Sequence, residues 1–126
     1  MKNPIRNLVA VNAANPQLAT LARAAALALA KAKDAAGAAE DAAGRATFTV
    51  DWEPAFKDIK ELSAKHKDAT FTLYGDAFAK QHWISKAVYQ GGKALEENTL
   101  SRIDGEAFRG VYKEIFGEAF VEKQSA

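Results

Sequence analysis

The chain has 126 residues, a length that suits a single domain with its own hydrophobic core. It contains no cysteine, which excludes disulfides, thiolate metal sites and a cysteine nucleophile. Its net charge is only +1, so the molecule as a whole has no general attraction for nucleic acid.

Charge is distributed unevenly along the chain. Residues 1–33 hold five bases and no acid, whereas residues 94–126 hold seven acids and four bases. The basic N-terminal third favours a local nucleic-acid contact. The candidate phosphate ligands in it are Arg6, Arg23, Lys31 and Lys33. No apolar stretch reaches the ~20 residues that a membrane-spanning helix needs, so we expect no membrane segment. The absence of cysteine fits a cytoplasmic location, the host cytoplasm if the protein is viral.

The start of the chain is predicted to be separate from the rest. Residues 1–14 are interpreted as an N-terminal arm or an edge strand, because the apolar residues 8–11 are flanked by asparagines. Residues 15–126 are predicted to form a single compact domain.

A long alanine-rich helix is predicted to follow the arm. Asn15 suits the N-cap, and Pro16 suits the first helical position. Half of the 34 residues from 13 to 46 are alanine, the residue with the highest helix propensity. Helical spacing places one set of residues on the inner face: Leu18, Leu21, Ala22, Ala25, Leu29 and Ala36.

Two short strands are predicted around a second helix. Residues 46–52 and 69–74 alternate apolar and polar side chains, which is typical of half-buried strands. A helix is expected between them, from Pro54 to about Lys67. The pattern leaves both parallel and antiparallel pairing of the two strands open.

The C-terminal half is predicted to be helical. We expect a helix over 77–89, a break at Gly91 and Gly92, and a last helix over about 102–122. The last helix carries aromatic residues four positions apart, which gives an apolar stripe. The residues of this stripe are candidate partner-binding residues: Phe108, Tyr112, Phe116 and Phe120. Trp83, which lies outside the stripe, is a further candidate.

The predicted fold class is α+β and mostly α-helical. About four helices would pack with a small sheet of two or three strands, where the third strand would come from the N-terminal segment. An all-α bundle is the alternative.

A hypothesis of catalytic function depends on Asp76 and His82, which could form an acid–base pair near a predicted strand-to-helix turn. It requires both side chains to meet in one pocket. A capping role for Asp76 and an ordinary surface role for His82 are the simpler interpretation. We therefore assign no catalytic, cofactor-binding or metal-binding residue and expect no cofactor.

We expect a non-enzymatic protein-binding module that acts by contact, as a small inhibitor or adaptor does. Its size suits an accessory protein of a phage or a mobile element. A nucleic-acid-binding protein or a structural subunit of a larger assembly is the alternative. The surplus of aromatic residues also favours a homo-oligomer.

Overall fold

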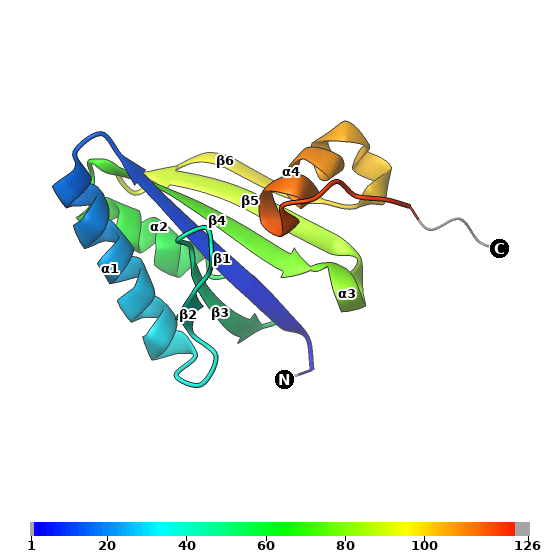
Figure 1. Ribbon diagram of the computed structural model, residues 1–126, viewed down its shortest axis with the longest axis horizontal. Coiled ribbons are helices and arrows are strands. Elements are labelled where there is room, and N and C mark those ends of the chain that lie inside the picture. Colours follow the sequence, from blue (N-terminus) through cyan, green and yellow to red (C-terminus); the bar gives the residue numbers. More distant parts are fainter. Residues whose placement is uncertain (1, 123–126) are drawn as a thin grey trace.

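The computed structural model describes residues 2–122, in which one antiparallel sheet of six strands carries helices on both faces (Figure 1). The strand order is β2-β3-β1-β4-β5-β6. The strands are β1 (Pro4–Ala13), β2 (Ala39–Glu40), β3 (Ala46–Asp51), β4 (Ala69–Ala77), β5 (Trp83–Gln90) and β6 (Lys93–Leu100). The helices are α1 (Pro16–Lys33), α2 (Phe56–Lys65), α3 (Phe78–Gln81) and α4 (Glu106–Phe116), with a 3-10 turn, η1 (Arg102–Asp104).

The prediction of a mostly helical protein with a two- or three-stranded sheet is wrong, as is the all-α alternative. Helix, with the 3-10 turn included, and strand contribute nearly equally, at 38% and 36% of the described residues. The largest error lies in residues 77–89, where the helix α3 has only four residues and is followed by β5. Both faces of β5 are covered, with Ile84 and Tyr89 each fully buried, so the sequence lacks the alternation that marks a strand.

The N-terminal segment lies in the interior of the sheet rather than at its edge or outside it as an arm. Strand β1 pairs antiparallel with β3 on one side and with β4 on the other. Leu8, for example, lies opposite Thr47 of β3 and Tyr74 of β4. The segment therefore belongs to the same domain as the rest of the described chain.

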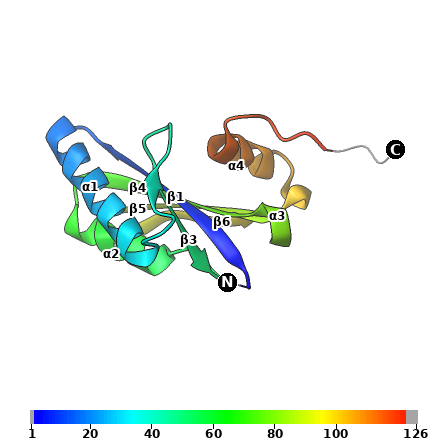
Figure 2. The ribbon, with the colours of Figure 1, turned by 60° about the horizontal axis from the view of Figure 1, so that its bottom comes forward.

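The two faces of the sheet are covered differently. Figure 2 shows α1 and α2 on one side of the sheet and α4 on the other. The α1 and α2 side holds the larger core, to which Phe48, Phe71 and Tyr89 contribute the largest fully buried side chains. A smaller core under α4 surrounds Phe108.

Helix α1 packs on the sheet through its alanines. Its buried residues are Ala19, Ala22, Ala26 and Ala30. The large aromatic side chains of the sheet fill much of this core, and the helix adds the methyl groups of these alanines together with the half-buried Leu27 and Leu29. Two leucines expected on the inner face lie on the surface instead: Leu18 is 37% exposed and Leu21 is 61% exposed.

Candidate functional site

The outward side of α1 carries a continuous row of small and apolar residues. Five positions recur at spacings of three and four, which places them on one side of the helix. We call this row the outer seam; it consists of Leu18, Leu21, Ala25, Ala28 and Ala32. Ala25 is half-buried and the other four residues are exposed. Spacing of this kind is what a second helix packs against.

A small cavity lies between the outer seam and the end of α2. Leu18 and Leu21 line this cavity of about 120 Å³ together with residues 65–69, among which Asp68 is an acid. At the other end of α1, Lys33 forms an ion pair of 2.8 Å with Asp58, near the start of α2. These two contacts show that the two helices run antiparallel.

The charged side chains of α1 are all basic. The helix contains Arg23, Lys31 and Lys33 and no acid. Among residues 2–122, neither Arg23 nor Lys31 has an ion-pair partner. Arg23 does not border the seam, because it lies on the flank of α1 that faces β1 and lines a cavity there.

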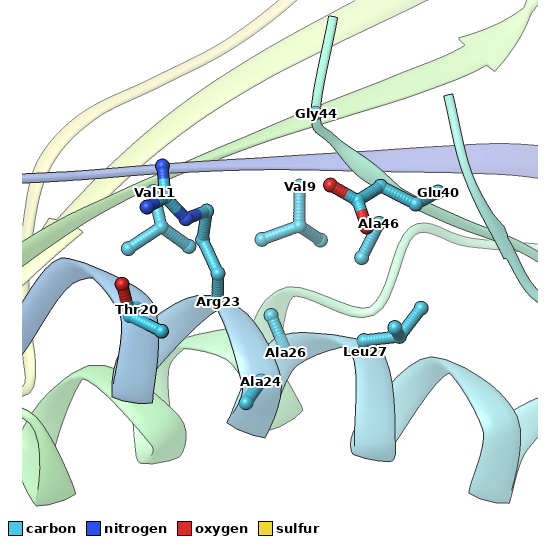
Figure 3. Close-up of a pocket in the computed structure, with 10 residues that line it drawn as sticks. All are labelled: Val9, Val11, Thr20, Arg23, Ala24, Ala26, Leu27, Glu40, Gly44 and Ala46. Carbon is cyan, nitrogen blue, oxygen red and sulfur yellow. The ribbon is translucent and has the colours of Figure 1, made fainter. Parts of the chain in front are cut away.

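A second cavity, of about 300 Å³, lies on the other flank of α1 (Figure 3). It separates the helix from β1 and from the chain around β2 and β3. Val9, Val11 and Leu27 give it an apolar lining, and Arg23 and Glu40 place one cation and one anion on it. Ala24 and Ala26 of α1 line this cavity, and their short side chains leave space between the helix and β1.

The predicted aromatic stripe forms a cluster within the molecule. Phe108 is 1% exposed and belongs to the core under α4. Tyr112, Phe116 and Phe120 are half-buried and pack against that core. Phe78, from α3, joins the cluster, with its ring centroid 5.6 Å from that of Phe108. These rings thus hold α4 to the sheet, and parts of four of them, all except Phe108, remain accessible.

Trp83, the fifth partner-binding candidate, is half-buried at the start of β5. Its Nε1 donates to Oε1 of Gln81 at 3.2 Å. The alternation of residues 46–52 places Trp52 on the same face as Phe48, yet the Trp52 side chain is 65% exposed. The N–H of Glu53 donates to the Asp51 carbonyl at 3.0 Å, closing a tight turn in which Trp52 has φ 76°. Positive φ is rare for a large side chain, and no sequence signal marks it here.

Asp76 and His82 are not joined by a hydrogen bond or an ion pair in the described part of the chain. The Asp76 carboxylate accepts from the Arg6 guanidinium and from the Phe78 N–H, both at 3.2 Å. His82 ends α3 in the left-handed conformation, with φ 62°. Asp76 thus pairs with Arg6 and accepts from the first N–H of α3, and His82 is exposed at the end of that helix.

The four candidate phosphate ligands do not form one surface. Arg6 lies on the face of the sheet that carries α4, where its guanidinium is 5.8 Å from the centre of the Phe116 ring. Arg23, Lys31 and Lys33 lie on α1, on the opposite side of the sheet. Arg6 and Lys33 are each paired with an acid, which reduces the positive charge available to a phosphate.

A polar network links α4 to strands β4 and β5. Glu114 of α4 accepts from the Tyr74 hydroxyl and from the Lys86 ammonium, each at 2.8 Å. Burial raises the pKa of the Tyr74 phenol above its usual value, and the hydrogen bond to Glu114 raises it further.

Asp41 is held by Arg45. Burial alone would raise the pKa of the Asp41 carboxyl, but hydrogen bonds and the charge of Arg45 outweigh the effect of burial and hold this pKa below its usual value.

Comparisons with family models, with curated proteins and with solved structures find no match to this chain. Within residues 2–122, none of the helices has the length and apolarity that crossing a bilayer requires.

Proposed function

We propose that this chain is a non-enzymatic protein-binding module that acts by contact, and that the outer seam of α1 is the surface it uses. One observation supports this function above the others: α1 exposes Leu18 and Leu21, while its fully buried residues are four alanines and only Leu27 and Leu29 of its leucines pack against the core. In a helix that served only its own core, the larger apolar side chains would lie inside, because burial of a leucine contributes about 1.5–3 kcal/mol.

The seam also suits close contact with another backbone. Ala25, Ala28 and Ala32 have no side-chain atom beyond Cβ, so a partner can approach the helix axis closely along this part. Leu18 and Leu21 then provide larger side chains at one end, where they can enter a partner's surface. A small inhibitor or adaptor works through a surface of this kind.

The test is site-specific photocrosslinking in the native cells. A benzoyl-phenylalanine replaces Leu21, and a control variant carries the same group at Leu95 of β6, which is equally exposed at 62%. We expect a discrete crosslinked protein from the Leu21 variant that is absent from the Leu95 variant. The captured protein is then purified, and its binding is measured directly.

Either of two outcomes would count against this function. Crosslinks that are the same at both positions would mean that the seam has no preferred partner. A purified partner that binds the Leu21→Ser variant as tightly as the wild type would place its docking site elsewhere.

A further inference from the structure

We infer that the cavity of about 300 Å³ between α1 and β1 binds a small zwitterion, a molecule in which an apolar chain joins a carboxylate to an ammonium group. This cavity and the small cavity beside Leu18 and Leu21 have no lining residue in common. The site is therefore separate from the outer seam and independent of the proposed protein contact.

The floor of the cavity belongs to the core of the domain. Val9, Ala26 and Ala46 line it and are buried, and they come from β1, α1 and β3 respectively. Because packed core side chains keep fixed positions, the shape of the cavity is set before a ligand enters. Its volume of about 300 Å³ lies at the lower end of the range of small-molecule sites, ~300–1,000 Å³. The cavity therefore suits a small ligand with an apolar body.

Two charged side chains line this cavity without neutralising each other. In the part of the chain that the structure describes, neither Arg23 nor Glu40 takes part in an ion pair. The charged residues that follow Glu40 in the chain, Asp41 and Arg45, pair with each other at 2.8 Å. A ligand that carries both charges would supply the missing partner of each side chain.

The two charged groups lie at different ends of an apolar strip. Glu40 of β2 pairs with Ala46 of β3, which lies opposite Val9 of β1. Figure 3 shows the Glu40 carboxylate at this end of the cavity and the Arg23 guanidinium at the end where Val11 lies. Val9 and Val11 are two residues apart on one face of β1, so they form the strip between the charges.

This arrangement selects a zwitterion over a ligand with a single charge. The planar guanidinium of Arg23 is able to donate two parallel hydrogen bonds to a carboxylate, and the Glu40 carboxylate is able to accept from an ammonium group. The chain between the two groups would cover the valines and Leu27. A simple anion or a simple cation would leave one of the two side chains without a partner.

The test is titration of the ¹⁵N-labelled protein, followed by the chemical shifts of its backbone amides. The probes are 4-aminobutanoate, 6-aminohexanoate and 8-aminooctanoate, which differ in chain length, with hexanoate and hexylamine as single-charge controls. We expect the best amino acid to bind with a dissociation constant on the order of 1 mM, at least about fivefold more tightly than either control. The shifts should concentrate at Val9, Val11 and Ala26, which line the cavity.

Matched variants assign the two charges. Arg23→Gln and Glu40→Gln should each weaken binding of the best amino acid by at least about fivefold. In Glu40→Gln that amino acid should bind no more tightly than hexanoate, because its ammonium group has lost its partner. Lys31→Gln removes another exposed base of α1 that does not line the cavity, and it should leave binding unchanged. All three positions are exposed, so circular dichroism should match the wild type.

Three results would overturn the inference. The first is the absence of shifts at the cavity amides with all three amino acids. The second is binding of hexanoate or hexylamine as tight as that of the best amino acid, which would mean that only one charge is recognised. The third is unchanged binding in Arg23→Gln or in Glu40→Gln. None of these results bears on the crosslinking test at Leu21, so the two proposals fail separately.

Discussion

The side chain of Asn7 connects the interior strand β1 to the start of α2. Its Oδ1 accepts a hydrogen bond of 3.0 Å from the Ala55 N–H, and its Nδ2 donates to the Ile5 carbonyl at 3.1 Å. Asn7 is fully buried, so both bonds are shielded from water. Residues 48 positions apart in the chain are thereby held in one arrangement.

We expect Asn7→Ala to lower the free energy of unfolding by about 1–3 kcal/mol, because the Ala55 N–H would be left buried without a partner. Asn12→Ala, on the exposed end of the same strand, serves as the control and should change stability by less than about 0.5 kcal/mol. Urea unfolding of the two variants measures the difference. Equal stabilities would mean that water replaces the lost bond.

Gly75 in β4 is predicted to tolerate no side chain. A Cβ at this position would lie 2.7 Å from Cγ of Pro54 and would also collide with Oγ of Ser85. We expect Gly75→Ala to cost about 1–3 kcal/mol through overpacking, read from the denaturant midpoint. Gly110→Ala serves as the control in which the added side chain has space, because nothing lies within 4 Å of a Cβ placed at this position. The gain in helix propensity should stabilise α4 by up to about 1 kcal/mol.

The turn at Trp52 stores backbone strain that depends on the side chain. Since φ is 76°, a residue with a Cβ is strained there and glycine is not. We expect Trp52→Gly to be more stable than Trp52→Ala by about 1 kcal/mol, although alanine is the better residue at most positions. Thermal unfolding of the two variants gives the comparison, and a more stable alanine variant would contradict it.

Arg45 holds the C-terminal end of α4. Its guanidinium donates to the carbonyls of Glu114 at 2.8 Å and Ile115 at 3.0 Å, and to the Asp41 carboxylate at 2.8 Å. We expect Arg45→Ala to cost about 1–3 kcal/mol and to speed amide hydrogen exchange in the last turn of α4. Arg102→Ala removes an exposed ion pair with Glu122 and should cost less than about 1 kcal/mol.

Stability should fall in alkaline solution in part because of Tyr89. Burial raises the pKa of this phenol, and its hydrogen bond of 2.7 Å to Glu97 raises it further. A folded-state pKa above the unfolded value of about 10 means that the contribution is complete below about pH 10 and declines as pH rises beyond it. Unfolding measured at about pH 8 and about pH 11 should show a smaller alkaline loss in Tyr89→Phe than in the wild type. Parallel losses would contradict this assignment.

Local signals in the sequence predicted several elements. The strands at 46–52 and 69–74 are confirmed as β3 and β4, and the helix that starts at Pro16 is confirmed as α1. Asn15 caps that helix, since its Oδ1 accepts from the Gln17 N–H at 2.9 Å. These predictions succeeded because alternation and capping depend on residues close together in the chain.

Strands β5 and β6 had no such signal. Apolar residues lie on both faces of β5, and spacings such as Ile84 to Val88 also match a helix. Strand β6 is exposed along most of its length and has no apolar face. The turn between the strands uses Gly91 and Gly92, both with positive φ, which is typical of a tight hairpin and was interpreted as a helix break.

The outer seam could not be located from α1 alone. The apolar arc of α1 is broad, and the sequence does not say which part of it faces the core. The sheet decides this, because Phe48, Phe71 and Tyr89 fill much of the core and the fully buried residues of α1 are all alanines, with Leu27 and Leu29 half-buried beside them. Which leucines face the core therefore depends on residues far from them in the chain.

The central position of β1 affects how the protein can be made. A ribosome releases the N-terminus first, yet β1 pairs with β3 and with β4, which ends at Ala77. At about 5–20 residues per second, roughly 3–13 s pass between synthesis of the end of β1 and of the end of β4. During that interval the side of β1 that faces β4 in the finished sheet has no strand to pair with, so an incomplete chain exposes an unpaired strand edge that favours aggregation.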